Sequence, residues 1–553
     1  MQTRQRTLRT RIATCFGAIV ASAALALAQQ PVPLTPPEAI PGVADAQPIF
    51  VPQSPVFHAD AAVNPAEAAF APTGPTWDQY QDVLRRLQAT EQRLNSMTAA
   101  QDQPPARRIY ADGNPNVPSA EQRIAALEAS TGAKPSAPSF PSVRLSGFFH
   151  LDSGYVDQSG NNRTTLGDIQ DGVGFRRARL QAVGSVAEFT NYSLEVDFAT
   201  AGRPSFMDVW GEQTHVPILG NVRIGHFRQP FSMDSLTSIR QLDFLERSLP
   251  FQAFVPFRRV GVMAYDKSED EMWTWAYSVY RTGGFFDAPL GDSRFATDIG
   301  DNGGASFSGR LTHLLWYDEE AQGRYLLHIG GGYNYSRITK NGPNGGVYEA
   351  RVIPEFFVGD PAGGGTTVNG TPFYADTGRL PASSFNLYNL ELAGQWGQFH
   401  FQSEYMGTSV NQTNGGSVYY DGAYFQTGYF LTGEHRSYNR TVGVFDSVKP
   451  LTEFFSLGRN AGFCGWGAWE LTSRISYVNL NNAGANPLGP PAGYVPPPLT
   501  PNPGRLTNTT IGLNWFWNSY AEVQFNAIYS QLDNAFFGNS NSITYATRFQ
   551  VAF

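Results

Sequence analysis

Residues 221–265 read NVRIGHFRQPFSMDSLTSIRQLDFLERSLPFQAFVPFRRVGVMAY. Apolar residues alternate with polar or small ones at both ends, as Val222 and Ile224 do at the start and Val260 and Val262 at the end, so each end is predicted to be a β-strand. About thirty residues between them do not alternate, and a loop of that length in a β domain is either functional or disordered. Its many Phe and Leu side chains favour burial. We therefore expect it to fold into the mouth of a barrel and narrow it.

The rest of the chain from residue 143 onward also alternates. Arg177 and Arg179 share one strand face with Gln181, and Glu195 and Asp197 share a face of the next strand. Short and long connections follow one another in turn, which is typical of an outer-membrane barrel with short turns at one rim and long loops at the other. Such a barrel has an even number of strands, so we assign residues 346–357 to a loop and predict about 16 strands.

The composition excludes several classes of function. Lys and Arg total 39 against 47 Asp and Glu, so the net charge of -8 argues against a nucleic-acid partner. After the N-terminus no apolar run is long enough for a membrane-spanning helix. Cys15 lies in an apolar leader, which leaves Cys464 without an intrachain disulfide partner and excludes a cysteine-built metal site. No histidine constellation suggests a metal, and no cofactor is expected.

The first 142 residues differ from the barrel. Residues 1–28 combine a basic start, an apolar run and an Ala-Leu-Ala cleavage site, which predicts an export signal peptide. Residues 29–75 form a Pro/Ala-rich linker. Residues 76–99 carry apolar residues at alternating spacings of three and four, which predicts a short coiled coil or, alternatively, a lone amphipathic helix. Residues 100–142 read as a second linker with a short helix. The predicted fold is thus an all-β transmembrane antiparallel barrel over residues 143–553 with an inward-folded constriction loop, preceded by these segments.

Several motifs along the barrel occur in one order: Phe-Arg-Arg-Ala-Arg at 175–179, Leu-Glu-Arg-Ser-Leu at 245–249, the run from Tyr429 to Tyr438, and Gly-Ala-Trp-Glu-Leu at 467–471. With these motifs the chain resembles the phosphate-selective porin O and P family over roughly residues 143–553. The resemblance implies a trimeric, 16-stranded outer-membrane porin whose third loop folds inward. It further implies passage of small anionic or polar solutes such as phosphate.

A porin needs a lined constriction, and rings of Arg or Lys favour anions. The resemblance points to Arg176, Arg177 and Arg247, and alternation supports Arg177 and Arg179 facing the lumen. Arg176 has the opposite, lipid-facing parity, so we expect it to bend inward or to lie at the rim. The pore-lining or anion-binding candidates are Arg176, Arg177, Arg179, Arg223, Arg228, Arg240, Arg247, Arg258 and Arg259. The expected lumen counter-charges are Glu195, Asp197, Asp243 and Glu246.

Alternatives stay open. The arginines of the second strand could pair with Glu195 and Asp197 merely to brace the wall. Family members place a lysine where Ser235 stands and an arginine where Phe148 stands, which argues against high phosphate selectivity and leaves a general or weakly cation-selective porin as the alternative. An enzyme barrel would rest on His435 and Ser437, and we expect no enzyme. A structural envelope anchor is the third alternative, in which the coiled coil contacts the cell wall while outer-membrane lipid surrounds the barrel.

Overall fold

The computed structural model describes residues 140–199, 204–282, 304–338, 346–358, 370–454, 465–488, 503–534 and 536–553. The predicted signal peptide, linkers and coiled coil lie outside these ranges apart from residues 140–142, as does Cys464. No helix within the described ranges is long and apolar enough to cross a membrane.

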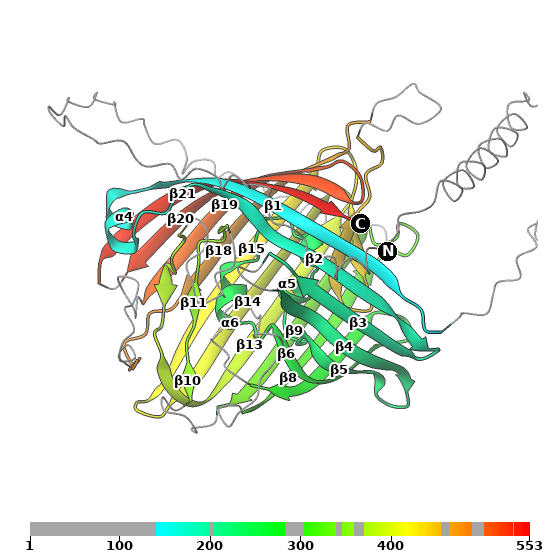
Figure 1. Ribbon diagram of the computed structural model, residues 1–553, viewed down its shortest axis with the longest axis horizontal. Helices are drawn as coiled ribbons and strands as arrows, with labels where there is room; N and C mark the ends of the chain where they lie inside the picture. Colours follow the sequence, from blue (N-terminus) through cyan, green and yellow to red (C-terminus); the bar gives the residue numbers. More distant parts are fainter. Residues whose placement is uncertain are drawn as a thin grey trace, which may run out of the picture. The chain divides into compact units, whose positions relative to one another are not determined.

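The described chain forms an antiparallel β-barrel (Figure 1). Its sheet has 17 strands, and one of them, β10 (Val347–Tyr348), joins through only two residues of β13. The remaining 16 form the wall, which closes where β1 pairs with β21 over residues 148–158 and 542–552. The wall strands are β1 (Arg144–Gln158), β2 (Gly172–Ala187), β3 (Thr190–Asp197), β4 (Ser205–Val216), β5 (Gly220–Arg228), β6 (Arg258–Lys267), β7 (Trp273–Arg281), β8 (Ala305–Tyr317), β9 (Tyr325–Arg337), β13 (Leu380–Trp396), β14 (Phe399–Gln412), β15 (Ser417–Phe430), β18 (Ala468–Asn479), β19 (Gly504–Phe516), β20 (Ala521–Asn534) and β21 (Gly538–Ala552). The predicted strand number is confirmed.

The two faces of each wall strand differ in chemistry. In β20 the inward residues Glu522, Gln524 and Asn526 are buried, whereas Phe525 and Tyr529 point outward and are exposed. Successive side chains of a strand point to opposite faces, so a period-2 sequence places polar groups in the lumen and apolar groups against lipid. The lumen residues are buried because two loops and a hairpin fill much of the interior.

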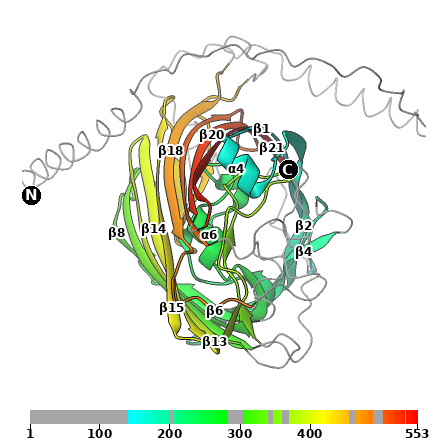
Figure 2. The same ribbon diagram turned by 90° about the vertical axis from the view of Figure 1, so that its left-hand side faces the viewer.

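The first insertion is the segment between β5 and β6, which we call the constriction loop (residues 229–257). It contains α5 (Met233–Leu236), the 3₁₀ turn η1 (Ile239–Gln241) and α6 (Leu249–Phe254). The Ser232 hydroxyl accepts a hydrogen bond from the Ser235 amide and caps α5, and Pro250 lies in the first turn of α6, where its missing N–H is not needed. Figure 2 shows α6 inside the ring of strands. The predicted inward fold of this loop is therefore present.

The second insertion lies between β9 and β13, and residues 346–357 belong to it as predicted. Two short strands, β11 (Arg351–Val352) and β12 (Ala375–Asp376), pair with each other inside it. Gln252 of α6 exchanges two hydrogen bonds with the backbone of Ile353, at 2.9 and 3.2 Å. Phe251 and Phe254 share one buried cluster with Tyr348 of this segment. The two loops thus pack as one body within the barrel.

The third insertion comes from the connection between β15 and β18. It holds a hairpin of β16 (Arg436–Asn439) and β17 (Val444–Val448), which sequence alternation did not predict. Arg310 of β8 donates from Nη2 to the Gly443 carbonyl at 2.8 Å, and Arg436 pairs with Asp243 of the constriction loop. The hairpin therefore contacts both the inner wall and the constriction loop. A further helix, α4 (Gly160–Leu166), lies in the connection between β1 and β2.

Candidate pore constriction

Glu246 is the main electrostatic anchor of the constriction loop. Its carboxylate lies 2.9 Å from Arg176 Nε, 2.9 Å from Arg177 Nη2 and 3.1 Å from Arg548 Nη2. Arg548 also donates two hydrogen bonds to Asp152 of β1 in a bidentate pair, at 2.6 and 2.7 Å. These five side chains join β1, β2 and β21 to the loop at the seam where the barrel closes.

A β-bulge explains why Arg176 and Arg177 both reach the loop. In the pairing of β1 with β2, His150 faces Arg177 and Leu151 faces Phe175, so Arg176 is an extra residue without a partner position. A bulge breaks the alternation locally and re-aims a side chain. The bulge thus turns Arg176 inward despite its lipid-facing parity, and its guanidinium also lies 4.1 Å from the ring centre of Phe357.

The surroundings of Glu246 favour its charged form. Burial alone would raise the pKa of this carboxyl, but Arg176, Arg177 and Arg548 outweigh burial and hold the pKa well below its ordinary value. An ionised Glu246 compensates the nearby guanidinium groups, which makes it a structural counter-charge.

Arg247, the next residue, turns back into its own loop. Its Nε donates to the Asp234 carbonyl and its Nη2 to the Thr237 carbonyl, both at 2.7 Å. The side chain is 4% exposed and lies near the rings of Phe251 and Phe257. Burial, followed by the nearby charge of Arg228, lowers its pKa well below the ordinary value. Its contacts hold the ends of α5 and the following turn together.

Glu404 on the opposite wall supports the same helix. Its oxygens accept hydrogen bonds from the backbone amides of Met233 and Asp234, at 3.1 and 2.7 Å. These are amides of the first turn of α5, which have no partner within the helix. Glu404 and Arg247 therefore hold the two ends of α5.

The arginines of β2 and β6 form a charge cluster with acids of β3 and β4. Arg179 lies 2.7 Å from Asp197 and 3.7 Å from Glu195. Arg258 lies 3.5 Å from Glu195 and 3.0 Å from Asp208. Asp208 was not among the predicted residues, although its parity on β4 matches that of Glu212. Arg259 is buried at the start of β6.

Arg223, Arg228 and Arg240 differ in how far their charge is compensated. Arg223 lies 2.7 Å from Glu212 and 4.0 Å from the ring centre of Trp210. Arg228 donates Nη1 to the carbonyls of the last turn of α5 and the residue after it, at 3.0 to 3.1 Å. Arg240 lies 5.7 Å from the ring centre of Phe148. Within the described ranges, neither Arg228 nor Arg240 has a carboxylate within 4.0 Å.

Three further arginine pairs were missed from the sequence. Arg310 lies 2.7 Å from Glu391, Arg474 lies 2.9 Å from Glu355, and Arg436 pairs with Asp243. The inward parity of Arg310 and Arg474 on their strands was a usable signal. For a hairpin residue such as Arg436, parity gives no information about which side chains it will contact.

Asp243, His400 and Glu470 bring one ligand atom each within 4.8 Å of one another. Carboxylate and imidazole groups are possible metal ligands. However, Arg436 already supplies a cation to Asp243, and His400 Nε2 lies 2.6 Å from a Glu470 oxygen. Asp243 therefore ties the constriction loop to the hairpin, and His400 and Glu470 join β14 to β18.

A cavity of about 270 Å³ remains between the constriction loop, the hairpin and the inner wall of β4 to β8. We call it the side cavity. Its wall includes Asp208, Trp210, Arg223, Arg228, Leu236, Met263, Arg310 and Val442. A solute in this cavity would contact guanidinium groups.

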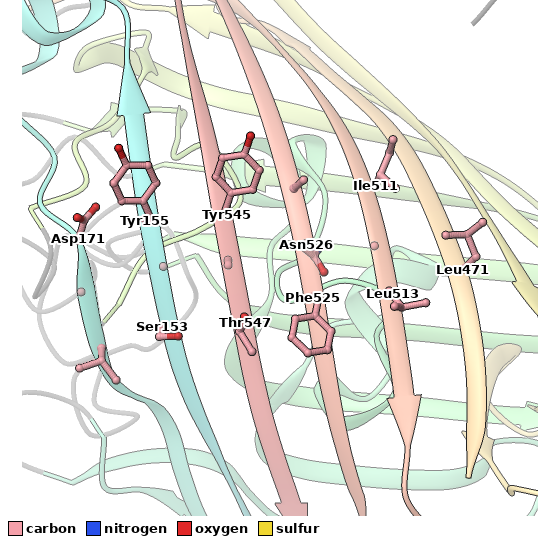
Figure 3. A pocket seen from close by; sticks show the side chains of 16 residues that line it. Ser153, Tyr155, Asp171, Leu471, Ile511, Leu513, Phe525, Asn526, Tyr545 and Thr547 are labelled. Carbon is pink, nitrogen blue, oxygen red and sulfur yellow. The ribbon is translucent and has the colours of Figure 1, made fainter. Parts of the chain in front are cut away.

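A separate groove of about 820 Å³ lies on the outer face of β1, β2 and β18 to β21. Figure 3 shows Tyr155, Tyr545 and Phe525 on adjacent strands of this groove. These side chains are 55%, 54% and 43% exposed and point away from the lumen. The groove therefore faces the membrane side of the wall and is not part of a path through the barrel.

Comparison with known proteins fits this architecture. The model of the family described as phosphate-selective porin O and P matches residues 143–553. The chain belongs to the phosphate-selective porin O and P family. This porin is 23% identical over 411 residues to Porin O of Pseudomonas aeruginosa, covering 70% of this chain and 84% of that protein. It is 26% identical over 415 residues to an uncharacterized protein of Caulobacter vibrioides, covering 72% and 76%.

The porin also aligns with the anion-selective porin from Comamonas acidovorans at 11% identity and a TM-score of 0.41, covering 74% of this chain and 99% of that one. Family membership places the protein in the outer membrane of a Gram-negative bacterium.

Two positions depart from the family pattern expected from the sequence. The Phe148 ring occupies the lumen between Arg179 and Arg240, with ring-centre distances of 5.8 and 5.7 Å. Ser235 is fully buried in α5. Neither residue adds a positive charge to the constriction.

Proposed function

We propose that this porin is a passive channel for small polar solutes with a mild preference for anions. The observation that carries the proposal is the state of Arg228 and Arg240, whose guanidinium groups contact no described carboxylate. Most other arginines around the loop are paired with acids, so they contribute little net field. A guanidinium without a directly paired carboxylate in a narrow, low-dielectric passage favours anions.

Strong phosphate selectivity is not part of the proposal. Arg176 and Arg177 are shared with the family motif, but both contact Glu246. Phe148 and Ser235 replace two further cations that the family resemblance implies. A phosphate ion at the loop would therefore have to compete with Glu246 for the same guanidinium groups.

The segments before the barrel have proposed roles as well. We propose that residues 1–28 direct export, that residues 29–75 act as a linker, and that the coiled coil predicted for residues 76–99 joins a homotrimer or contacts the cell wall. The barrel itself is surrounded by outer-membrane lipid.

An enzymatic function has no support at the one motif considered for it. The Ser437 hydroxyl donates to the Ser447 carbonyl at 2.7 Å, and no contact within the described residues joins it to His435. A serine nucleophile needs an adjacent base. The motif instead belongs to the β16–β17 hairpin.

The test is the reversal potential of single channels in planar bilayers under a potassium chloride gradient. The wild-type channel is expected to give a reversal potential that indicates preference for chloride over potassium. The double variant Arg228→Gln with Arg240→Gln is expected to shift this potential to zero or to the sign of cation preference. Arg163→Gln is the matched control, since Arg163 lies on α4 with a side chain 57% exposed. A cation-leaning wild type, or an unchanged double variant, would contradict the anion preference.

A further inference from the structure

The side cavity combines guanidinium groups with a largely apolar wall. Trp210, Leu236, Met263 and Val442 line it together with Arg228. Sites that bind small organic molecules are mostly apolar, with a few polar groups that fix orientation, and occupy about 300 to 1,000 Å³. At about 270 Å³ the side cavity suits a solute no larger than a single ring with one polar group.

One guanidinium of the cavity wall has no carboxylate within 4.0 Å among the described residues. Three arginines and one aspartate line it. Arg223 is paired with Glu212 at 2.7 Å and Arg310 with Glu391 at 2.7 Å. Asp208 is paired with Arg258 at 3.0 Å. Arg228 is the remaining guanidinium, and Asp208 and Glu195 act on its charge only from beyond ion-pair distance. It can therefore pair directly with one carboxylate, and a second negative charge would meet no free cation.

Arg228 also has an unused donor. Its Nε is buried and has no hydrogen-bond partner in the part of the chain that the structure describes. A buried N–H without an acceptor is unfavourable, and a bound carboxylate would supply the acceptor. Phosphate has several strongly hydrated oxygens, which would lose water against the apolar wall without enough donors to replace it.

We propose that the side cavity binds organic monoanions that carry an apolar ring or chain next to a carboxylate, in preference to phosphate. This inference rests on the channel function proposed above and names its solute class. Arg228 binds the carboxylate, and Met263, Leu236 and Trp210 contact the apolar part.

The experiment measures block of chloride current through the full chain in planar bilayers at pH 7. Sodium benzoate, sodium acetate and sodium phosphate are the probes. Benzoate is expected to halve the current at about tenfold lower concentration than acetate, because its ring removes additional apolar surface from water. Phosphate is expected to block no better than acetate.

Two variants separate the contributions. Met263→Gln keeps the side-chain length but makes the wall polar, so it is expected to weaken benzoate block toward that of acetate. Arg228→Gln is expected to weaken block by both carboxylates. Leu451→Gln is the control for the first, since Leu451 is 70% exposed outside the cavity.

The two levels of the proposal fail differently. Discrete channel steps with equal block by benzoate and acetate, or with phosphate as the strongest blocker, would overturn the solute class and leave the channel intact. Folded wild-type protein without channel steps would overturn the channel function itself.

Discussion

Arg548 in β21 lies 3.1 Å from Glu246 in the constriction loop, although the two residues are 302 positions apart in the sequence. Both side chains are buried, and Glu246 contacts two further arginines of β2. The position of the loop therefore depends on one carboxylate shared among three cations.

Replacing Glu246 with Gln is expected to destabilise the loop and to raise anion selectivity. Removing one member of a buried ion pair leaves uncompensated charge and costs about 3–5 kcal/mol. Thermal unfolding in detergent reports the first effect and the reversal potential the second. Glu319→Gln, at a side chain 67% exposed, should change neither. Full stability in the Glu246 variant would show that the loop is held mainly by its apolar contacts.

Gly332 in β9 is expected to reject even a methyl group. A Cβ atom there would lie 2.1 Å from the Phe231 carbonyl oxygen of the constriction loop. Overpacking of this kind costs about 1–3 kcal/mol, so Gly332→Ala should lower the melting temperature and alter single-channel conductance. At Gly331 the nearest atom would be 3.3 Å away on the neighbouring strand. Gly331→Ala is therefore the control, and equal effects of the two variants would contradict contact with the loop.

Asp376 is expected to make the second inserted loop sensitive to pH. Burial, followed by the neighbouring Glu349, raises the pKa of Asp376 to about 7. Because the folded pKa exceeds the ordinary value of about 3.9, the associated stability is fully present below that value and is lost as pH rises through about 7.

Open-channel current should accordingly become noisier between pH 5 and pH 8 as this loop loosens. Asp376→Asn keeps the neutral form at every pH and should make the noise independent of pH. A wild type with the same noise at both ends of this range would refute the assignment.

Arg310→Met should release the β16–β17 hairpin from the inner wall. Arg310 donates to the carbonyls of Val442 and Gly443 at 2.6 and 2.8 Å while it pairs with Glu391. We expect higher conductance together with a stability loss of about 3–5 kcal/mol, since Glu391 would be left buried without its guanidinium. The double variant Arg310→Met with Glu391→Gln should recover stability but keep the higher conductance. If conductance stays at the wild-type level in both variants, the hairpin does not limit current.

Alternation predicts the barrel well because each wall strand separates lipid from lumen. The strand number, the inward constriction loop and the assignment of residues 346–357 to a loop follow from this pattern and from chain connectivity. Arg176 shows its limit, because an unpaired residue in β2 reverses the parity expected at that position. The two-residue alternation of a strand sequence does not indicate where a β-bulge occurs.

Ion-pair partners were harder to predict than strand faces. Glu195 and Asp197 were expected on the lumen face across the hairpin from Arg179; Asp197 lies opposite Arg179 and Glu195 opposite Gln181, since β2 and β3 are neighbours in sequence. Glu246 with Arg548 and Asp243 with Arg436 join segments far apart in the chain, and nothing local in either segment specifies the other. The hairpin lacks the regular alternation of a wall strand, so its place in the lumen is visible only in the folded molecule.

The seam between β1 and β21 also sets an order of assembly. β1 and β21 are the first and last strands of the wall, so pairing them closes a loop of almost the whole barrel sequence and costs much chain entropy. This pairing therefore forms late, unless the intervening strands have already brought the two edges together. Arg548 lies on β21, whereas Arg176 and Arg177 lie on β2. Glu246 can therefore meet its β2 partners in an open sheet but gains Arg548 at its final spacing only on closure. An unclosed barrel would hold the loop loosely, and the same event that removes the exposed sheet edges would tighten the passage.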